Sequence, residues 1–164
     1  MKKIFILIIS ILLFSNIAYG ADLQIMGVGW KRLDWKTFLA GAAVSVVAHE
    51  AGHLIALYAT NTEYEFDSIT SFTFKGSTPN DARWIARSGF IAQQGIGLIL
   101  SHFKKESSFT KGFNVMNLLT IATYPLRHSE DGDLNTLNKN GANSDLEYAI
   151  FTGIAIRNLI VLEW

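Results

Sequence analysis

The sequence contains no cysteine, which excludes disulfide bridges, thiolate metal ligands and a cysteine nucleophile. Any bound metal must therefore be held by histidine, aspartate or glutamate. Such a ligand set disfavours a closed structural zinc site. An excess of either charge is also lacking, because 14 basic residues balance 14 acidic ones and no long basic run occurs. We therefore expect no nucleic acid among the partners.

The first 20 residues have the pattern of a targeting segment. Lys2 and Lys3 are followed by an apolar run at 4–17 and by a small-residue cleavage motif at 18–21. This pattern predicts a signal peptide, and an uncleaved signal anchor is the alternative because the apolar run is near the length at which the two overlap. Either segment directs the chain to a membrane or beyond it, so a cytosolic location is not expected.

The remaining residues, 21–164, are expected to form a single helical domain, since the 164-residue chain has the length of one domain with a core. Apolar segments separated by polar loops predict a mainly α fold of about four helices. These helices are expected at 37–60, 82–103, 112–126 and 146–161. Partial alternation of aromatic and β-branched residues at 62–76 predicts a short β-hairpin or strand pair after the first helix.

The first predicted helix, 37–60, is long enough to cross a bilayer, and its small residues suit close helix packing. With 49% apolar residues, the sequence predicts a membrane-embedded bundle in the bacterial inner membrane or an equivalent membrane, with lipid as a partner. The distribution of lysine and arginine contradicts the positive-inside rule for alternating spans. The topology is therefore left open, and a secreted or periplasmic location is the alternative.

Three ionisable residues interrupt an apolar stretch of this helix, which reads VVAHEAGHLIALY from Val46 to Tyr58. On a helix, His49 and His53 are about 40° apart in azimuth and one turn apart in height, so both imidazoles can bind one metal ion. Glu50 is displaced by about 100° and lies beside the ligands rather than among them. This H-E-x-x-H spacing is typical of two zinc ligands with a glutamate as general base.

The surroundings of the motif favour a functional site over an ordinary helix surface. Only apolar or small residues flank the three ionisable side chains between Val46 and Ile55. A buried His-Glu-His group without a partner is costly, and in lipid an ionisable residue is a functional hypothesis by default. The motif therefore predicts Zn²⁺ bound by His49 and His53, with Glu50 as the catalytic base.

The stretch HEAGH at 49–53, on so apolar a helix, resembles the site-2 protease family of intramembrane zinc metalloproteases. Gly52 matches the glycine that precedes the second histidine in that family. The strand region at 64–74 matches the family's short β-region, and 88–95 is a loose counterpart of its small-residue motif, lacking the proline. Residues 114–133 look like the family's asparagine-containing helix and the Asp-Gly pair after it.

The resemblance implies that Asp131, which precedes Gly132, is the third metal ligand. This chain departs from the family pattern, because LRHSE at 126–130 is inserted before the aspartate. The insertion leaves three alternatives for the third ligand. They are Asp133, His128 as in a soluble three-histidine site, and Glu147 as in a two-histidine, one-glutamate site.

Polar residues of the other predicted helices have weaker functional signals. Gln93 and Gln94 can face the site or bond to a neighbouring helix, and Asn114 and Asn117 can orient substrate backbone or tie helices together. His102 ends an apolar segment and is expected at an interface rather than on a metal.

The sequence therefore predicts a zinc-dependent endopeptidase that hydrolyses peptide bonds in or next to a membrane, with a metal-bound water activated by Glu50. Its expected substrates are peptides or membrane proteins. Two alternatives stay open, namely a soluble zincin-type peptidase and a non-catalytic metal-binding membrane module.

Overall fold

The structure is a computed structural model that describes residues 23–25, 28–30, 33–68, 71–124 and 132–163. The predicted signal segment at 1–20 lies outside the described residues. The helices are α2 (Trp35–Ala59), α3 (Pro79–Phe103), α4 (Ser108–Thr123), α5 (Asp133–Lys139) and α6 (Ser144–Ile160), followed by the 3-10 turn η2 (Val161–Glu163). The strands are β1 (Leu23–Ile25), β2 (Val28–Trp30), β3 (Glu63–Ser68) and β4 (Ser71–Lys75).

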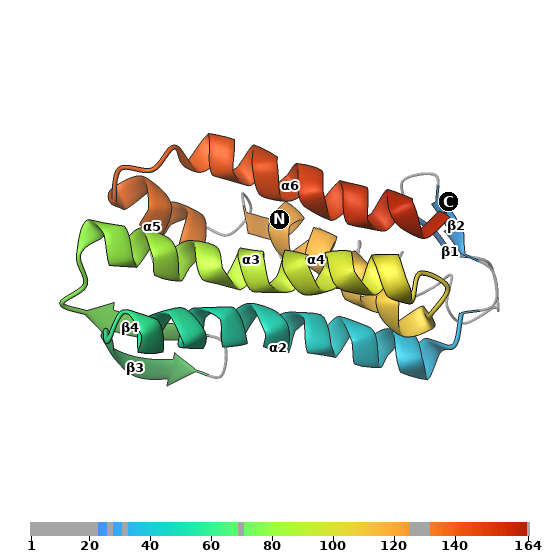
Figure 1. The fold of residues 1–164 in the computed structure, drawn as a ribbon, viewed down its shortest axis with the longest axis horizontal. Coiled ribbons are helices and arrows are strands. Elements are labelled where there is room, and N and C mark those ends of the chain that lie inside the picture. The colour runs from blue at the N-terminus through green and yellow to red at the C-terminus, as the bar shows by residue number, and fades with distance from the viewer. Residues whose placement is uncertain (1–22, 26–27, 31–32, 69–70, 125–131, 164) are drawn as a thin grey trace, which may run out of the picture.

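The helices form an elongated bundle with the two hairpins at opposite ends (Figure 1). In this view α2, α3 and α6 lie side by side, and α4 lies behind α3, where it packs against all three. The short α5 packs against α3 and α6. The strands form two antiparallel hairpins, β1 with β2 and β3 with β4. The predictions of a mainly α fold and of a hairpin after the first helix are confirmed.

Side-chain caps explain why the helices start two to four residues before their predicted positions. Asp34 accepts a hydrogen bond from the Lys36 backbone nitrogen at 3.2 Å, so α2 begins at Trp35. Thr78 caps α3 in the same way, and the proline after it occupies the first turn, where no backbone donor is lost. Ser107 caps α4 and Asn143 caps α6. Each cap satisfies a backbone donor that the first helical turn leaves without a partner.

Two glycines allow α2 and α4 to approach until their backbones touch. A Cβ atom on Gly41 would lie 2.0 Å from the Phe109 carbonyl oxygen, and one on Gly112 would lie 1.9 Å from the Phe38 carbonyl oxygen. No side chain fits at either position, so the pair fixes the crossing of the two helices. The small residues of the first predicted helix serve the close packing that the sequence predicted for them.

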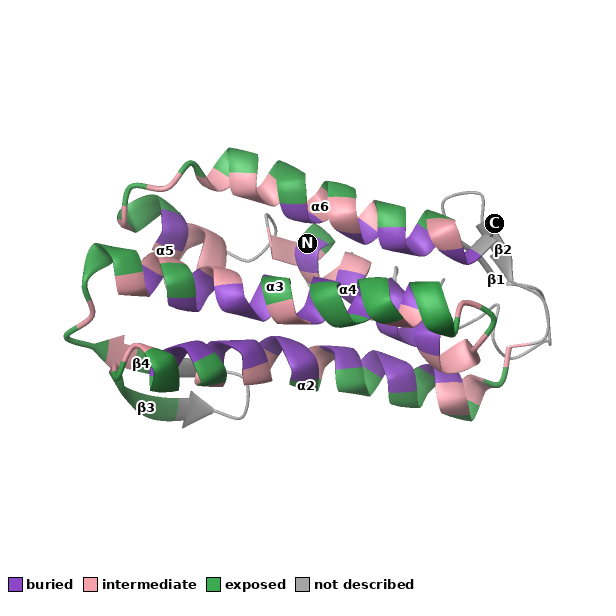
Figure 2. Cartoon of the chain, viewed as in Figure 1, coloured by how far each residue is buried: buried purple, intermediate pink, exposed green. Residues whose placement is uncertain are grey.

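Buried and exposed residues alternate along each helix of the bundle (Figure 2). Many large apolar side chains are exposed, and many polar side chains are buried. The exposed apolar residues of the helices are Leu39, Val44, Val47, Ile55, Tyr58, Trp84, Ile91, Ile96, Leu98, Ile99, Phe103, Leu146, Ile150 and Ile160. Besides the two motif histidines and Lys111, the buried polar residues are Ser45, Ser88, Gln93, Gln94, Ser101, Thr110, Asn114, Asn117 and Asn158. In the described part of the chain, α2 alone has the length and apolarity of a membrane span.

Candidate metal centre

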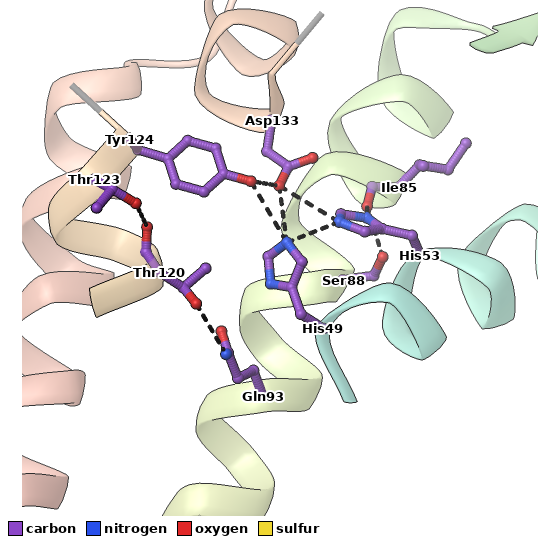
Figure 3. A network of polar contacts seen from close by, with 9 residues as sticks. All are labelled: His49, His53, Ile85, Ser88, Gln93, Thr120, Thr123, Tyr124 and Asp133. Atoms are coloured by element: carbon purple, nitrogen blue, oxygen red, sulfur yellow. Dashed lines mark hydrogen bonds and ion pairs between the residues drawn. The ribbon is translucent and has the colours of Figure 1, made fainter. Parts of the chain in front are cut away.

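The buried face of α2 carries both motif histidines, as the spacing predicted. His49 and His53 are 4% and 3% exposed, and both rings face α3 and α5 (Figure 3). Glu50 is half-buried and lies close enough to His53 for their charges to interact. The two imidazoles therefore converge on one face of α2, and the Glu50 carboxylate lies beside that face.

Asp133, the first residue of α5, completes a group of three potential metal ligands. Its Oδ2 atom lies 3.1 Å from His49 Nε2 and 3.4 Å from His53 Nε2, and the two Nε2 atoms are 3.1 Å apart. Donor atoms about 2.0–2.1 Å from a tetrahedral zinc ion are about 3.3–3.4 Å from one another. The three atoms therefore have nearly the spacing of three corners of such a tetrahedron.

The chemistry of these atoms also fits a cation. Burial by itself would raise the pKa of the Asp133 carboxyl group, but the charge of His53 and hydrogen bonds with both histidines outweigh it and hold this pKa well below its ordinary range. Asp133 is therefore a carboxylate at neutral pH, the form that binds metals. A bound cation would replace the imidazole protons that make these hydrogen bonds, because it bonds to the same three atoms.

Neighbouring groups hold two of the three ligands in place. The Nδ1 atom of His53 lies 2.7 Å from the Ile85 carbonyl oxygen, so it donates a proton there and leaves Nε2 with its lone pair for a metal. The Tyr124 hydroxyl donates to Asp133 Oδ2 and lies 3.5 Å from His49 Nε2. Hydrogen bonds of this kind orient metal ligands, and the one that His53 donates also raises the basicity of its ring.

Two glycines, one on α3 and one on α2, provide the space that the site requires. A Cβ atom on Gly89 of α3 would lie 2.4 Å from His53 Nε2 and 2.9 Å from His49 Cε1. On α2, a Cβ atom on Gly52 would lie 2.4 Å from the Ser88 carbonyl oxygen. Gly52, the glycine on which the family resemblance partly depends, therefore lets α3 approach the motif helix.

Of the four candidates for the third ligand, two lie within the described residues. Asp131, the residue implied by the resemblance, lies outside the described residues, as does His128. Asp133, an alternative from the sequence, is the residue that joins the histidines. Glu147 instead accepts hydrogen bonds from Arg87 Nε, at 2.9 Å, and from its Nη2 atom.

Sequence reasoning did not identify Tyr124 or Gly89 as site residues. Tyr124 follows the last residue of α4, and Gly89 lies within the apolar pattern of α3, so neither has a local signal of function. The partial alignment of 88–95 with the family's small-residue motif was the one pointer towards Gly89. His102 is exposed near the end of α3, where its ring packs against Phe103.

Comparisons of the chain with protein-family models, with curated proteins and with solved structures find no match. The resemblance to site-2 proteases therefore depends on the chain's own residues.

Proposed function

We propose that the protein is a zinc-dependent endopeptidase that cleaves peptide bonds in or next to a membrane, with His49, His53 and Asp133 as zinc ligands. The observation that carries the proposal is the convergence of their three donor atoms at 3.1–3.4 Å from one another. Two neutral imidazoles and one carboxylate are a typical ligand set of catalytic zinc, which keeps a further position open.

Glu50 is the proposed catalytic base. Zinc, when bound, lowers the pKa of a coordinated water to about 7 and polarises a carbonyl group. The Glu50 side chain is offset from the two imidazoles around the helix axis, so it can accept a proton beside the ligands without binding the metal. Tyr124 and the Ile85 carbonyl group keep Asp133 and His53 oriented during this step.

The distribution of apolar side chains supports a membrane location for this activity. Large apolar residues cover the outer faces of α2, α3 and α6, whereas glutamine, asparagine and serine side chains lie inside. Lipid solvates the exposed apolar side chains without cost. The buried polar side chains can form hydrogen bonds between helices. Peptide segments that enter or approach the bilayer are then the proposed substrates.

One observation favours a soluble, secreted peptidase as the second candidate, because α2 is the one helix of the described residues with the length and apolarity of a span. Carbonate extraction of membranes separates the two proposals. We expect the protein to stay in the pellet, and its release into the supernatant would replace the membrane enzyme with the soluble one.

Metal analysis of the purified protein and of its Glu50→Gln variant tests the catalytic proposal. We expect about one zinc ion per chain in both proteins and peptide cleavage in the unaltered protein alone. Absence of a bound transition metal after gentle purification would refute the metal centre. Bound zinc without any cleavage would instead favour a non-catalytic metal-binding membrane module.

A further inference from the structure

Two buried polar atoms beside the metal centre have no hydrogen-bond partner among the described residues. One is Nδ1 of His49, and the other is Oε1 of Gln93 on α3. The His49 residue is 4% exposed and Gln93 is fully buried, so bulk water does not reach them. Buried groups of this kind nearly always have a partner, which is a protein atom or an internal water molecule.

The contacts of Gln93 place its side-chain amide between α2 and α4, beside the turn of α2 that precedes His49. Its Nε2 atom donates to Ser45 Oγ at 2.8 Å and to Thr120 Oγ1 at 3.4 Å. Ser45 is one turn before His49 on α2, and Gln93 is one turn after Gly89, whose Cα faces both imidazoles. Figure 3 shows Gln93 on the side of His49 that is opposite to Asp133.

Binding of a metal by Nε2 makes the need for a partner stronger. A neutral imidazole that coordinates through one nitrogen carries its proton on the other, so Nδ1 of His49 becomes an N–H donor. Histidine ligands almost always donate this proton to a carboxylate, a carbonyl oxygen or a water molecule. The unpartnered Gln93 Oε1 is an acceptor, yet it does not bond to Nδ1 directly.

Further unpartnered atoms continue away from the site between α3, α4 and α6. Among the residues described, Gln94 Oε1, Asn114 Oδ1 and both amide atoms of Asn117 lack a partner. The Asn114 and Asn117 amides meet beside Gly97, where a Cβ atom would lie 2.5 Å from Asn114 Oδ1 and 3.3 Å from Asn117 Nδ2. Since donors and acceptors of neutral amides are mixed, water fits this set better than a cation, which would meet N–H groups.

We propose that a bound water molecule bridges His49 Nδ1 and Gln93 Oε1, and that it is the first of several internal waters extending towards Asn117 and Asn114. In this arrangement Gln93 is a positioning residue that holds the His49 ring through the water. The role in metal binding rests on the proposed function, whereas the water itself does not.

The test uses the full-length protein and three variants. Gln93→Met removes the acceptor at similar length, Gln93→Glu keeps an acceptor, and Gln94→Met is the control. Gln94 is also buried on α3, but its amide donates to the Phe151 carbonyl oxygen at 2.8 Å. Zinc affinity is measured by competition with a chromophoric chelator, and internal waters are located in a high-resolution experimental structure of the zinc-free protein.

We expect Gln93→Met to weaken zinc binding by about 10–100-fold, as for other orienting partners of metal ligands. Gln93→Glu and Gln94→Met should bind zinc nearly as tightly as the unaltered protein. We also expect water density within hydrogen-bond distance of both Nδ1 and Oε1. Equal zinc affinity in Gln93→Met and Gln94→Met would overturn the positioning role, and a direct protein partner for Nδ1 would overturn the water.

The outcome also separates this inference from the proposed function. If the unaltered protein binds no zinc, the proposed metal centre fails, but the zinc-free structure still decides whether the water is present. If Gln93→Met does not fold, that structure and the Gln93→Glu affinity remain as tests.

Discussion

Substituting Gly89 with alanine tests whether the space beside the two imidazoles is required for metal binding. The new methyl group would lie 2.4 Å from His53 Nε2, 2.7 Å from His53 Cε1 and 2.9 Å from His49 Cε1. Contacts between such atoms are normally about 3.5 Å or longer, so the His53 ring must move by about 1 Å or α3 must withdraw from α2. Both responses disturb the atoms proposed to bind zinc.

The magnitude follows from how His53 is held. Its Nδ1 atom is tied to the Ile85 carbonyl oxygen at 2.7 Å, and Ile85 is one turn before Gly89 on α3. The ring can therefore leave the methyl group only by losing that hydrogen bond or by following the helix. Ligand distances in metal sites are held within about 0.2 Å, so a 1 Å shift removes a ligand. Because orienting partners alone are worth about 10–100-fold, zinc affinity should fall by more than about 100-fold.

Gly95→Ala is the matched control, because it lies on the same helix and a Cβ atom there meets nothing within 4 Å. Both substitutions gain the helix propensity of alanine, up to about 1 kcal/mol. Only Gly89→Ala should lose zinc in a chelator competition, and the two variants should have the same helix content by circular dichroism. Equal zinc affinity in Gly89→Ala and Gly95→Ala would refute the geometry of the site.

Three further substitutions test the rest of the argument. Glu50→Gln should lower peptide cleavage by about 10²–10⁴-fold in a turnover assay while zinc content stays unchanged, and loss of zinc would make Glu50 a ligand instead. Asp133→Ala should lose most of the zinc by elemental analysis and Asp131→Ala should keep it, whereas the reverse result would restore Asp131 as the third ligand. Gly112→Ala should lower the stability against unfolding by about 3 kcal/mol or more, because its methyl group would meet the Phe38 carbonyl oxygen at 1.9 Å. Gly153→Ala on α6, where a Cβ atom meets nothing within 4 Å, is its control, and equal stability of the two would contradict the close crossing of α2 and α4.

The parts of the fold that were predictable from sequence depend on local patterns. The long apolar runs located α2, α3, α4 and α6, and the i, i+4 spacing located His49 and His53 on one buried face. The helix α5 (Asp133–Lys139) was missed because DLNTLNK is short and mostly polar, with no apolar period. The β1–β2 hairpin was missed because each strand has 3 residues, too few for an alternating pattern.

The third ligand was the least predictable part of the site, since its position depends on tertiary structure. Asp131 and Asp133 are two residues apart in a polar segment, and no local periodicity distinguishes them. Asp133 reaches the histidines because it is the first residue of α5, which packs against α3 and α6. The packing of α5 therefore determines which aspartate reaches the histidines, and the local sequence pattern does not predict this packing.

Helix packing and the geometry of the candidate metal centre depend on the same small residues in this protein. Gly52 allows α3 to approach α2, and Gly89 leaves the space that both imidazoles fill. Asp133 reaches the same point from α5, so a bound metal ion would join α2 to α5 across α3. A ligand that binds the folded state alone stabilises it in proportion to the logarithm of its concentration. The apolar outer faces take no part in this linkage. In the proposed membrane enzyme, lipid would therefore solvate these faces while the metal ion links the helices inside the bundle.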